Sequence, residues 1–146
     1  MFNAKTWKDG EFLAQQFLKN AGYKIIETNS KLAGAEVDIV ALYSKRQKLA
    51  ALKVQFKNNQ ITKPTYELLK KQAVDTYVFV EVKARNSLAF GAPEQAVNKQ
   101  KQAHIKRFAQ AFIIKNHLEN CGFRFDVISV LVDGNKSKIE HFVEAF

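Results

Sequence analysis

Three charged residues interrupt two stretches that are otherwise hydrophobic. Asp38 lies within "AEVDIVALY" (35–43), and Glu81 and Lys83 lie within "TYVFVEVKAR" (76–85). Both stretches are rich in β-branched and aromatic residues, which predicts strands. Because burying a charge costs several kcal/mol unless it pairs or holds a metal, charges at strand centres usually serve a purpose.

Alternate residues of a strand share a face, so Glu36 shares one with Asp38, and Glu81 shares one with Lys83. If the two strands are neighbours, carboxylates and a lysine converge on one patch. Oxygen ligands of this kind suit Mg²⁺ or Mn²⁺, which keep waters that a phosphodiester can replace. We expect Asp38, Glu81 and the carbonyl of Val82 to hold the ion. Lys83 is expected to orient or deprotonate the attacking water and to offset developing charge.

Two predicted helices bring further charges towards this patch. A helix over residues 5–21 carries Glu11 at the edge of its apolar stripe. A longer helix over residues 94–118 carries Lys101 inside its apolar stripe, about 40° from Val97 at ~100° per residue. Lys101 is therefore expected to face the sheet, and Glu11 can also point inward.

Each of these residues also has an ordinary structural role open to it. Lys101 can extend past apolar neighbours to solvent, and Glu11 can be a first-turn acid favoured by the helix dipole. Asp38 can form an ion pair with Lys83. The occurrence of all of them in one chain favours a shared site.

The positive charge of the chain is concentrated in one segment. Residues 43–73 hold eight basic side chains and one acid, a net +7 out of +9 for the whole chain. Such a segment favours a polyanionic partner, whereas the alternative is a solvated face that keeps the protein soluble. The residues expected to contact nucleic acid are Lys45, Arg46, Lys48, Lys53 and Arg85.

The length of 146 residues predicts a single domain, 1–146, with a basic insertion at about 43–75. No stretch approaches the ~20 apolar residues that span a bilayer, so no membrane partner is expected. The N-terminus has no apolar signal region, which predicts a cytoplasmic protein. Cys121 is the only cysteine and is expected to fill space near a turn.

The order of the elements predicts an α/β fold with a single mixed β-sheet and helices packed on it. Residues 49–56 are ambiguous between helix and strand. Helices are expected over 5–21, 62–73 and 94–118, and strands over 23–28, 35–43, 76–84, 123–132 and 138–143.

Several sequence blocks carry a resemblance to known families. "EVDIVA" followed by "FVEVKAR" resembles the Asp…Glu-x-Lys signature of the PD-(D/E)xK nucleases, which implies a restriction-endonuclease-like fold. Together with "GEFLAQQFLKNAGYKIIETN", "FGAPEQAVNKQK", "RFDVISV" and the terminal "AF", these blocks look like the uncharacterised bacterial YraN family. That pattern is similar to archaeal Holliday-junction resolvases. By this comparison the catalytic positions are Glu11, Asp38, Glu81, Lys83 and Lys101.

The chain departs from the family pattern at two places. Ala35 stands where the family usually has glycine before the glutamate of the strand, with Gly34 one residue earlier. About 32 residues, the basic segment, separate the two strands where the family generally has a short hairpin. This segment is expected either to extend a nucleic-acid groove or to decorate the sheet.

The resemblance implies a metal-dependent endonuclease of branched or structured DNA with Mg²⁺ or Mn²⁺ as cofactor. By analogy with the resolvases, a homodimer is expected. The first alternative is a catalytically silent nucleic-acid-binding module of the same fold. The second is a metal-free scaffold for partner proteins, which predicts no salt-sensitive DNA affinity.

Overall fold

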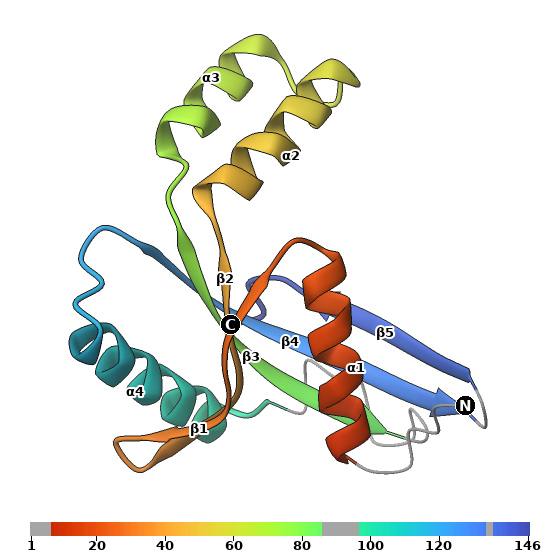
Figure 1. Ribbon diagram of the computed structural model, residues 1–146, viewed down its shortest axis with the longest axis vertical. Coiled ribbons are helices and arrows are strands. Elements are labelled where there is room, and N and C mark those ends of the chain that lie inside the picture. The colour runs from red at the N-terminus through yellow and green to blue at the C-terminus, as the bar shows by residue number, and fades with distance from the viewer. Residues whose placement is uncertain (1–6, 86–96, 134–135) are drawn as a thin grey trace.

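The computed structural model describes residues 7–85, 97–133 and 136–146 (Figure 1). In these residues, five strands form one mixed sheet in the order β1-β2-β3-β4-β5. The strands are β1 (Lys24–Leu32), β2 (Ala35–Tyr43), β3 (Thr76–Arg85), β4 (Gly122–Asp133) and β5 (Lys136–Phe142). The helices are α1 (Trp7–Asn20), α2 (Lys45–Lys57), α3 (Lys63–Gln72) and α4 (Lys99–Lys115). The predicted α/β fold is confirmed, and it is consistent with a restriction-endonuclease-like fold.

The central strand β3 has neighbours of opposite direction on its two sides. It pairs antiparallel with β2 and parallel with β4. A parallel pair needs a crossover connection, and α4 lies between β3 and β4 in the chain. The outer pairs, β1 with β2 and β4 with β5, are both antiparallel.

Helices α1 and α4 cover the sheet with two separate apolar clusters. Ala14 and Leu18 of α1 pack in one cluster with Val78 and Val80 of β3. The other cluster centres on Phe79 of β3 and on aromatic residues of α4. Because successive side chains of β3 point to opposite faces, one strand supplies both clusters.

The helices α2 and α3 form an antiparallel pair that projects from the sheet beyond the ends of β2 and β3 (Figure 1). We call this pair the arm. Ser44 caps α2 and Thr62 caps α3, each accepting a hydrogen bond from a backbone N–H of the first turn. The ambiguous residues 49–56 are therefore helical. Neither helix contains a buried residue, so the expectation that the helices pack on the sheet holds for α1 and α4 but is wrong for the arm.

A buried charge network ties the turn after α1 to the far edge of the sheet. Asp126 of β4 is fully buried and accepts hydrogen bonds from Arg124 at 2.9 and 2.8 Å. His141 of β5 contacts the same carboxylate at 2.7 Å, and Arg124 reaches the hydroxyl of Tyr23 at 2.6 Å. The pKa of Asp126 is lowered, because hydrogen bonds from His141 and Arg124 outweigh the cost of burial.

Parts of two predicted helices fall outside the described residues: 5–6 of the first helix and 94–96 of the long helix. The described part of the long helix begins at Lys99, after Asn98, whose side chain caps it. Within the described ranges, no helix is both long and apolar enough to cross a membrane.

Candidate metal and phosphodiester site

The strands β2 and β3 separate at the point where the charged residues lie. Their ladder runs from Tyr43–Thr76 to Ile39–Val80, whereas β3 continues to pair with β4 as far as Arg85–Leu131. The next residues in register beyond Ile39 and Val80 are Asp38 and Glu81. We call this point the fork.

The side chain of Asp38 replaces the missing backbone partner at the fork. Its Oδ2 accepts a hydrogen bond of 2.8 Å from the backbone N–H of Val82. In a strand the N–H and C=O of one residue point to the same neighbour, so the carbonyl of Val82 is also directed towards the gap. The two carboxylates therefore lie opposite each other at the fork, and the Val82 carbonyl stays a predicted third ligand.

Glu81 is the most deeply placed charged residue at the fork, with an exposed fraction of 5 %. Its Oε1 lies 3.2 Å from Nζ of Lys83, and its Oε2 lies 3.7 Å from Nζ of Lys101. Oε2 accepts no hydrogen bond within the described part of the chain. A buried carboxylate oxygen with only a long ionic contact can accept a closer cation.

Burial and neighbouring carboxylates raise the pKa of Asp38 from 3.8 to about 7. Burial is the largest cause, followed by the charge of Glu81, with a smaller contribution from Glu11; the hydrogen bond from Val82 opposes them. A carboxyl group whose pKa is this high is one that gains from a nearby cation.

The first helix brings Glu11 towards the fork because Gly10 lets it approach β3 closely. A Cβ built on Gly10 would lie 2.5 Å from the Cβ of Ala84, so only glycine fits at this contact. Glu11 is itself buried, with 7 % of its surface exposed. The prediction that Glu11 faces inward is thereby confirmed.

The N-terminal turn of α4 delivers Lys101. The side chain of Asn98 accepts a hydrogen bond of 2.8 Å from the backbone N–H of Lys101, which fixes the start of the helix. The Lys101 side chain then reaches Glu81 on the neighbouring strand. Lys101 therefore faces the sheet, as predicted from its place in the apolar stripe. Lys83 pairs with Glu81 rather than with Asp38, so the alternative of an Asp38–Lys83 ion pair is not what forms.

A hard divalent cation fits this donor set. Among residues 7–85, 97–133 and 136–146, no three or more His, Cys, Asp and Glu side chains gather closely enough to hold a metal. The fit therefore rests on Asp38, Glu81 and the Val82 carbonyl, and the buried Oε2 of Glu81 is an unsatisfied acceptor that a cation can contact. Two carboxylates plus waters and substrate oxygens are typical ligands of Mg²⁺.

The basic residues expected to contact nucleic acid do not form one group with the fork. Lys45, Arg46, Lys48 and Lys53 all lie on α2, beyond the Tyr43 end of β2. Tyr43 lies five residues after Asp38 along β2, a distance of roughly 17 Å at ~3.3 Å per residue. Arg85 lies at the opposite end of β3.

Lys48 differs from its neighbours in the arm. Its ammonium group donates a hydrogen bond to the hydroxyl of Thr76, and burial lowers its pKa. Lys48 therefore helps to join the arm to the sheet. Lys45, Arg46 and Lys53 are exposed.

Two residues that build the fork were not recognised from the sequence. Gly10 acts by the absence of a side chain, and only the packing of α1 on β3 reveals it. The cap at Asn98 has a sequence signal, since asparagine is favoured before a helix, but the helix was expected to begin earlier.

The chain is similar to bacterial proteins of about its own length. The sequence profile of the uncharacterised protein family UPF0102 matches residues 10–130. A UPF0102 protein of Alkaliphilus oremlandii is 36 % identical over 99 % of both chains. One from Trichlorobacter lovleyi is 39 % identical over 94 % of this chain and 86 % of its own. One from Caldicellulosiruptor bescii is 37 % identical over 94 % of this chain and 92 % of its own.

Proposed function

The chain belongs to the uncharacterised protein family UPF0102, which includes the YraN proteins, and we propose that it is a metal-dependent endonuclease of branched or structured DNA. The observation that carries the proposal is the fork. There, Asp38 and Glu81 meet where β2 leaves β3, and two lysines contact Glu81.

The ion would be held by Asp38, Glu81 and the carbonyl of Val82. When bound, Mg²⁺ or Mn²⁺ supplies Lewis-acid polarisation of the phosphodiester and lowers the pKa of a bound water. The raised pKa of Asp38 supports this role, because a carboxylate that is costly to ionise alone is stabilised by a cation beside it.

Lys83 is the residue that we expect to act on the reacting groups. Its side chain is 27 % exposed, so its ammonium group contacts both Glu81 and the solvent from which substrate arrives. From this position it can donate a hydrogen bond to the attacking water or to a phosphate oxygen. Positioned proton donors and acceptors of this kind typically contribute about 10²- to 10⁴-fold in rate.

Lys101 and Glu11 act as positioning residues in this proposal. Lys101 contacts Oε2 of Glu81 at 3.7 Å, whereas Lys83 contacts Oε1 of the same carboxylate. Glu11 adds negative charge beside Asp38, which raises the pKa of Asp38 and so strengthens the preference of the fork for a cation.

One observation favours the alternative of a nucleic-acid-binding module without catalysis. Both oxygens of Glu81 already face lysines, so this carboxylate is charge-balanced without an ion. In that case the fork would be a structural ion cluster. The arm and its basic residues would then carry the function, which is binding. The homodimer and the DNA substrate remain predictions for either reading.

Cleavage assays on defined substrates separate the two. The wild type is incubated with Mg²⁺ or Mn²⁺ and a labelled four-way junction, a flap, a linear duplex and a single strand, beside a gel-shift titration. Glu81→Gln should lose metal binding and cleavage together. Lys83→Ala should keep the metal and lose only the chemical step. Both variants should still bind DNA, and Glu81→Gln, which loses a negative charge, should bind at least as well as the wild type.

Glu36→Gln is the matched control, because Glu36 is an exposed carboxylate two residues before Asp38 on β2. It should cut like the wild type. A wild type that binds these substrates but cuts none would leave the binding module as the function. If Lys83→Ala cuts at the wild-type rate, the role given to Lys83 is wrong.

A further inference from the structure

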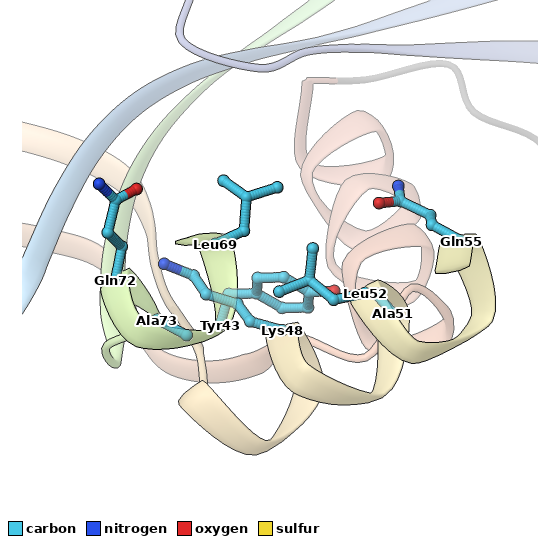
Figure 2. Close-up of a pocket in the computed structure, with 8 residues that line it drawn as sticks. All are labelled: Tyr43, Lys48, Ala51, Leu52, Gln55, Leu69, Gln72 and Ala73. Atoms are coloured by element: carbon cyan, nitrogen blue, oxygen red, sulfur yellow. The ribbon is translucent and has the colours of Figure 1, made fainter. Parts of the chain in front are cut away.

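The arm has two sides of different chemistry. On one side a groove of about 360 Å³ opens between the two helices (Figure 2). It is lined mainly by small, apolar and uncharged side chains: Tyr43, Lys48, Ala51, Leu52, Gln55, Leu69, Gln72 and Ala73. Tyr43, the last residue of β2, lies at the base of the groove and stacks on Tyr23.

The helical spacing places basic residues on the other side. Arg46 and Lys53 are seven residues apart on α2, so they lie on one face of that helix. Lys63 and Lys70 have the same spacing on α3. None of these four lines the groove, and all four are exposed. We call them the basic face.

The helix geometry supports this assignment independently. Leu49, Leu52 and Phe56 are the less exposed apolar residues of α2, and Phe56 stacks on Tyr66 of α3 at 4.8 Å. These residues form the contact between α2 and α3. On both helices the residues that line the groove lie on one side of this contact, and the basic face lies on the other side. The Lys70 ammonium lies 5.9 Å from the centre of the Tyr66 ring, on the side of the basic face.

The basic face holds four like charges close together. A spacing of seven residues is roughly 10 Å along a helix, and packed helices lie about 8–10 Å apart. Within the described ranges, no salt bridge joins any of the four side chains to an acid. Four cations at this spacing repel one another, and a polyanion laid across them removes that repulsion.

We propose that the basic face is a second nucleic-acid contact, which binds duplex phosphates away from the fork; this inference rests on the proposed function. Arg46, Lys53, Lys63 and Lys70 offer phosphate-binding groups, whereas the side chains that line the groove are mostly apolar or uncharged. Lys48 is left out of this set because its ammonium group already donates a hydrogen bond to Thr76.

The position of the arm defines the substrate more closely. It begins roughly 17 Å from Asp38, and its 13-residue helix α2 adds about 20 Å more. At ~3.4 Å per base pair, a substrate that reaches both the fork and the arm has about 5–11 base pairs of duplex beside the reacting phosphodiester. The affinity should therefore rise with duplex length and level off once the arm is covered.

The test is a binding measurement in EDTA, which does not depend on cleavage. Fluorescence anisotropy with labelled duplexes of increasing length is recorded from low to moderate salt. The variant replaces Arg46, Lys53, Lys63 and Lys70 with glutamine. The control replaces Lys19, Lys31, Lys115 and Lys136, which are exposed and lie outside the arm, so the two variants lose the same charge.

The basic-face variant should lose at least about tenfold in affinity, and its salt slope should fall by up to ~3.6, at ~0.9 per phosphate contact. The control should lose much less. Single changes at Lys53 and Lys63 should each reduce the slope by about 0.9, which tests the face even if the fourfold variant misfolds.

Equal losses in the two variants would overturn the inference in favour of net charge alone. Unchanged binding by the basic-face variant, or no duplex binding by the wild type, would overturn it too and leave the arm as a solvated or protein-binding surface. A wild type that binds through the basic face but never cuts removes only the nuclease proposal. A nuclease whose binding ignores these four residues removes only this inference.

Discussion

Replacing Asp38 with asparagine should stabilise the protein in the absence of metal. The pKa of Asp38 is raised by burial and by Glu81, so its ionised form opposes folding. Asparagine removes the charge but keeps an oxygen that can accept the hydrogen bond from Val82. The variant tests whether the fork gathers repelling carboxylates or a stabilising ion pair.

The sign and size follow from the pKa. Between pH 3.8 and about 7 the folded state holds a proton that the unfolded state has released, so the contribution of Asp38 to stability falls as the pH rises. Such a shift corresponds to at most about 4 kcal/mol at ~1.36 kcal/mol per pH unit. Because Asp38 and Glu81 share the repulsion, we assign about half of this free energy, roughly 2 kcal/mol above pH 7, to Asp38. Asp38→Asn should therefore raise the Tm by about 6 °C, at ~3 °C per kcal/mol.

The assay is thermal unfolding followed by circular dichroism in EDTA, with wild type, Asp38→Asn and the control Glu36→Gln. The Tm of Asp38→Asn should exceed that of the wild type by an amount that grows from pH 5 to pH 8. Over half of this difference in Tm should appear in that interval. Glu36→Gln should show no such growth, because Glu36 is exposed. Mg²⁺ or Mn²⁺ should raise the Tm of the wild type and of Glu36→Gln but not that of Asp38→Asn.

An Asp38→Asn variant that is less stable than the wild type at pH 8 would refute this reasoning. The carboxylate would then be a net stabilising partner in the folded protein. A metal-induced rise in Tm that survives in Asp38→Asn would place the cation elsewhere.

Two further substitutions test how the fold holds the fork. Gly10→Ala should cost about 1–3 kcal/mol in urea unfolding, because its Cβ would meet that of Ala84 and displace α1; a neutral effect would mean that this contact is not tight. Arg124→Ala should cost about 3–5 kcal/mol, because it leaves the buried Asp126 without its guanidinium partner, and a loss below about 1 kcal/mol would show that His141 alone compensates this charge.

The parts of the fold that could be predicted from sequence are those with strong local periodicity. The stretch 76–85 reads as a strand and is one, because its alternating residues feed the apolar clusters on both faces. The parity of Glu81 and Lys83, and the place of Lys101 in an apolar stripe, were enough to predict that these residues meet.

The arm could be predicted as a basic segment but not as a projecting helix pair. Residues 49–56 have apolar residues at both helical and strand spacing, and only their pairing with α3 through Phe56 and Tyr66 settles the conformation. No local signal tells that a helix will leave the sheet, because that depends on the absence of a surface to pack on.

The network of Arg124, Asp126, His141 and Tyr23 was not predicted, because its members lie up to about a hundred residues apart in the chain. Each alone is an ordinary polar residue near a strand. Their proximity arises from the pairing of β4 with β5 and from the packing of the turn after α1.

The central claim is that the fork holds a divalent cation, and a crystal soaked in Mn²⁺ tests it most directly through the anomalous signal of the ion. We predict one ion bound by Asp38, Glu81 and the carbonyl of Val82, with Oε2 of Glu81 turned from Lys101 towards the metal. A soaked crystal without an ion at the fork, in which Glu81 keeps both lysine contacts and Asp38 keeps only Val82, would contradict the account.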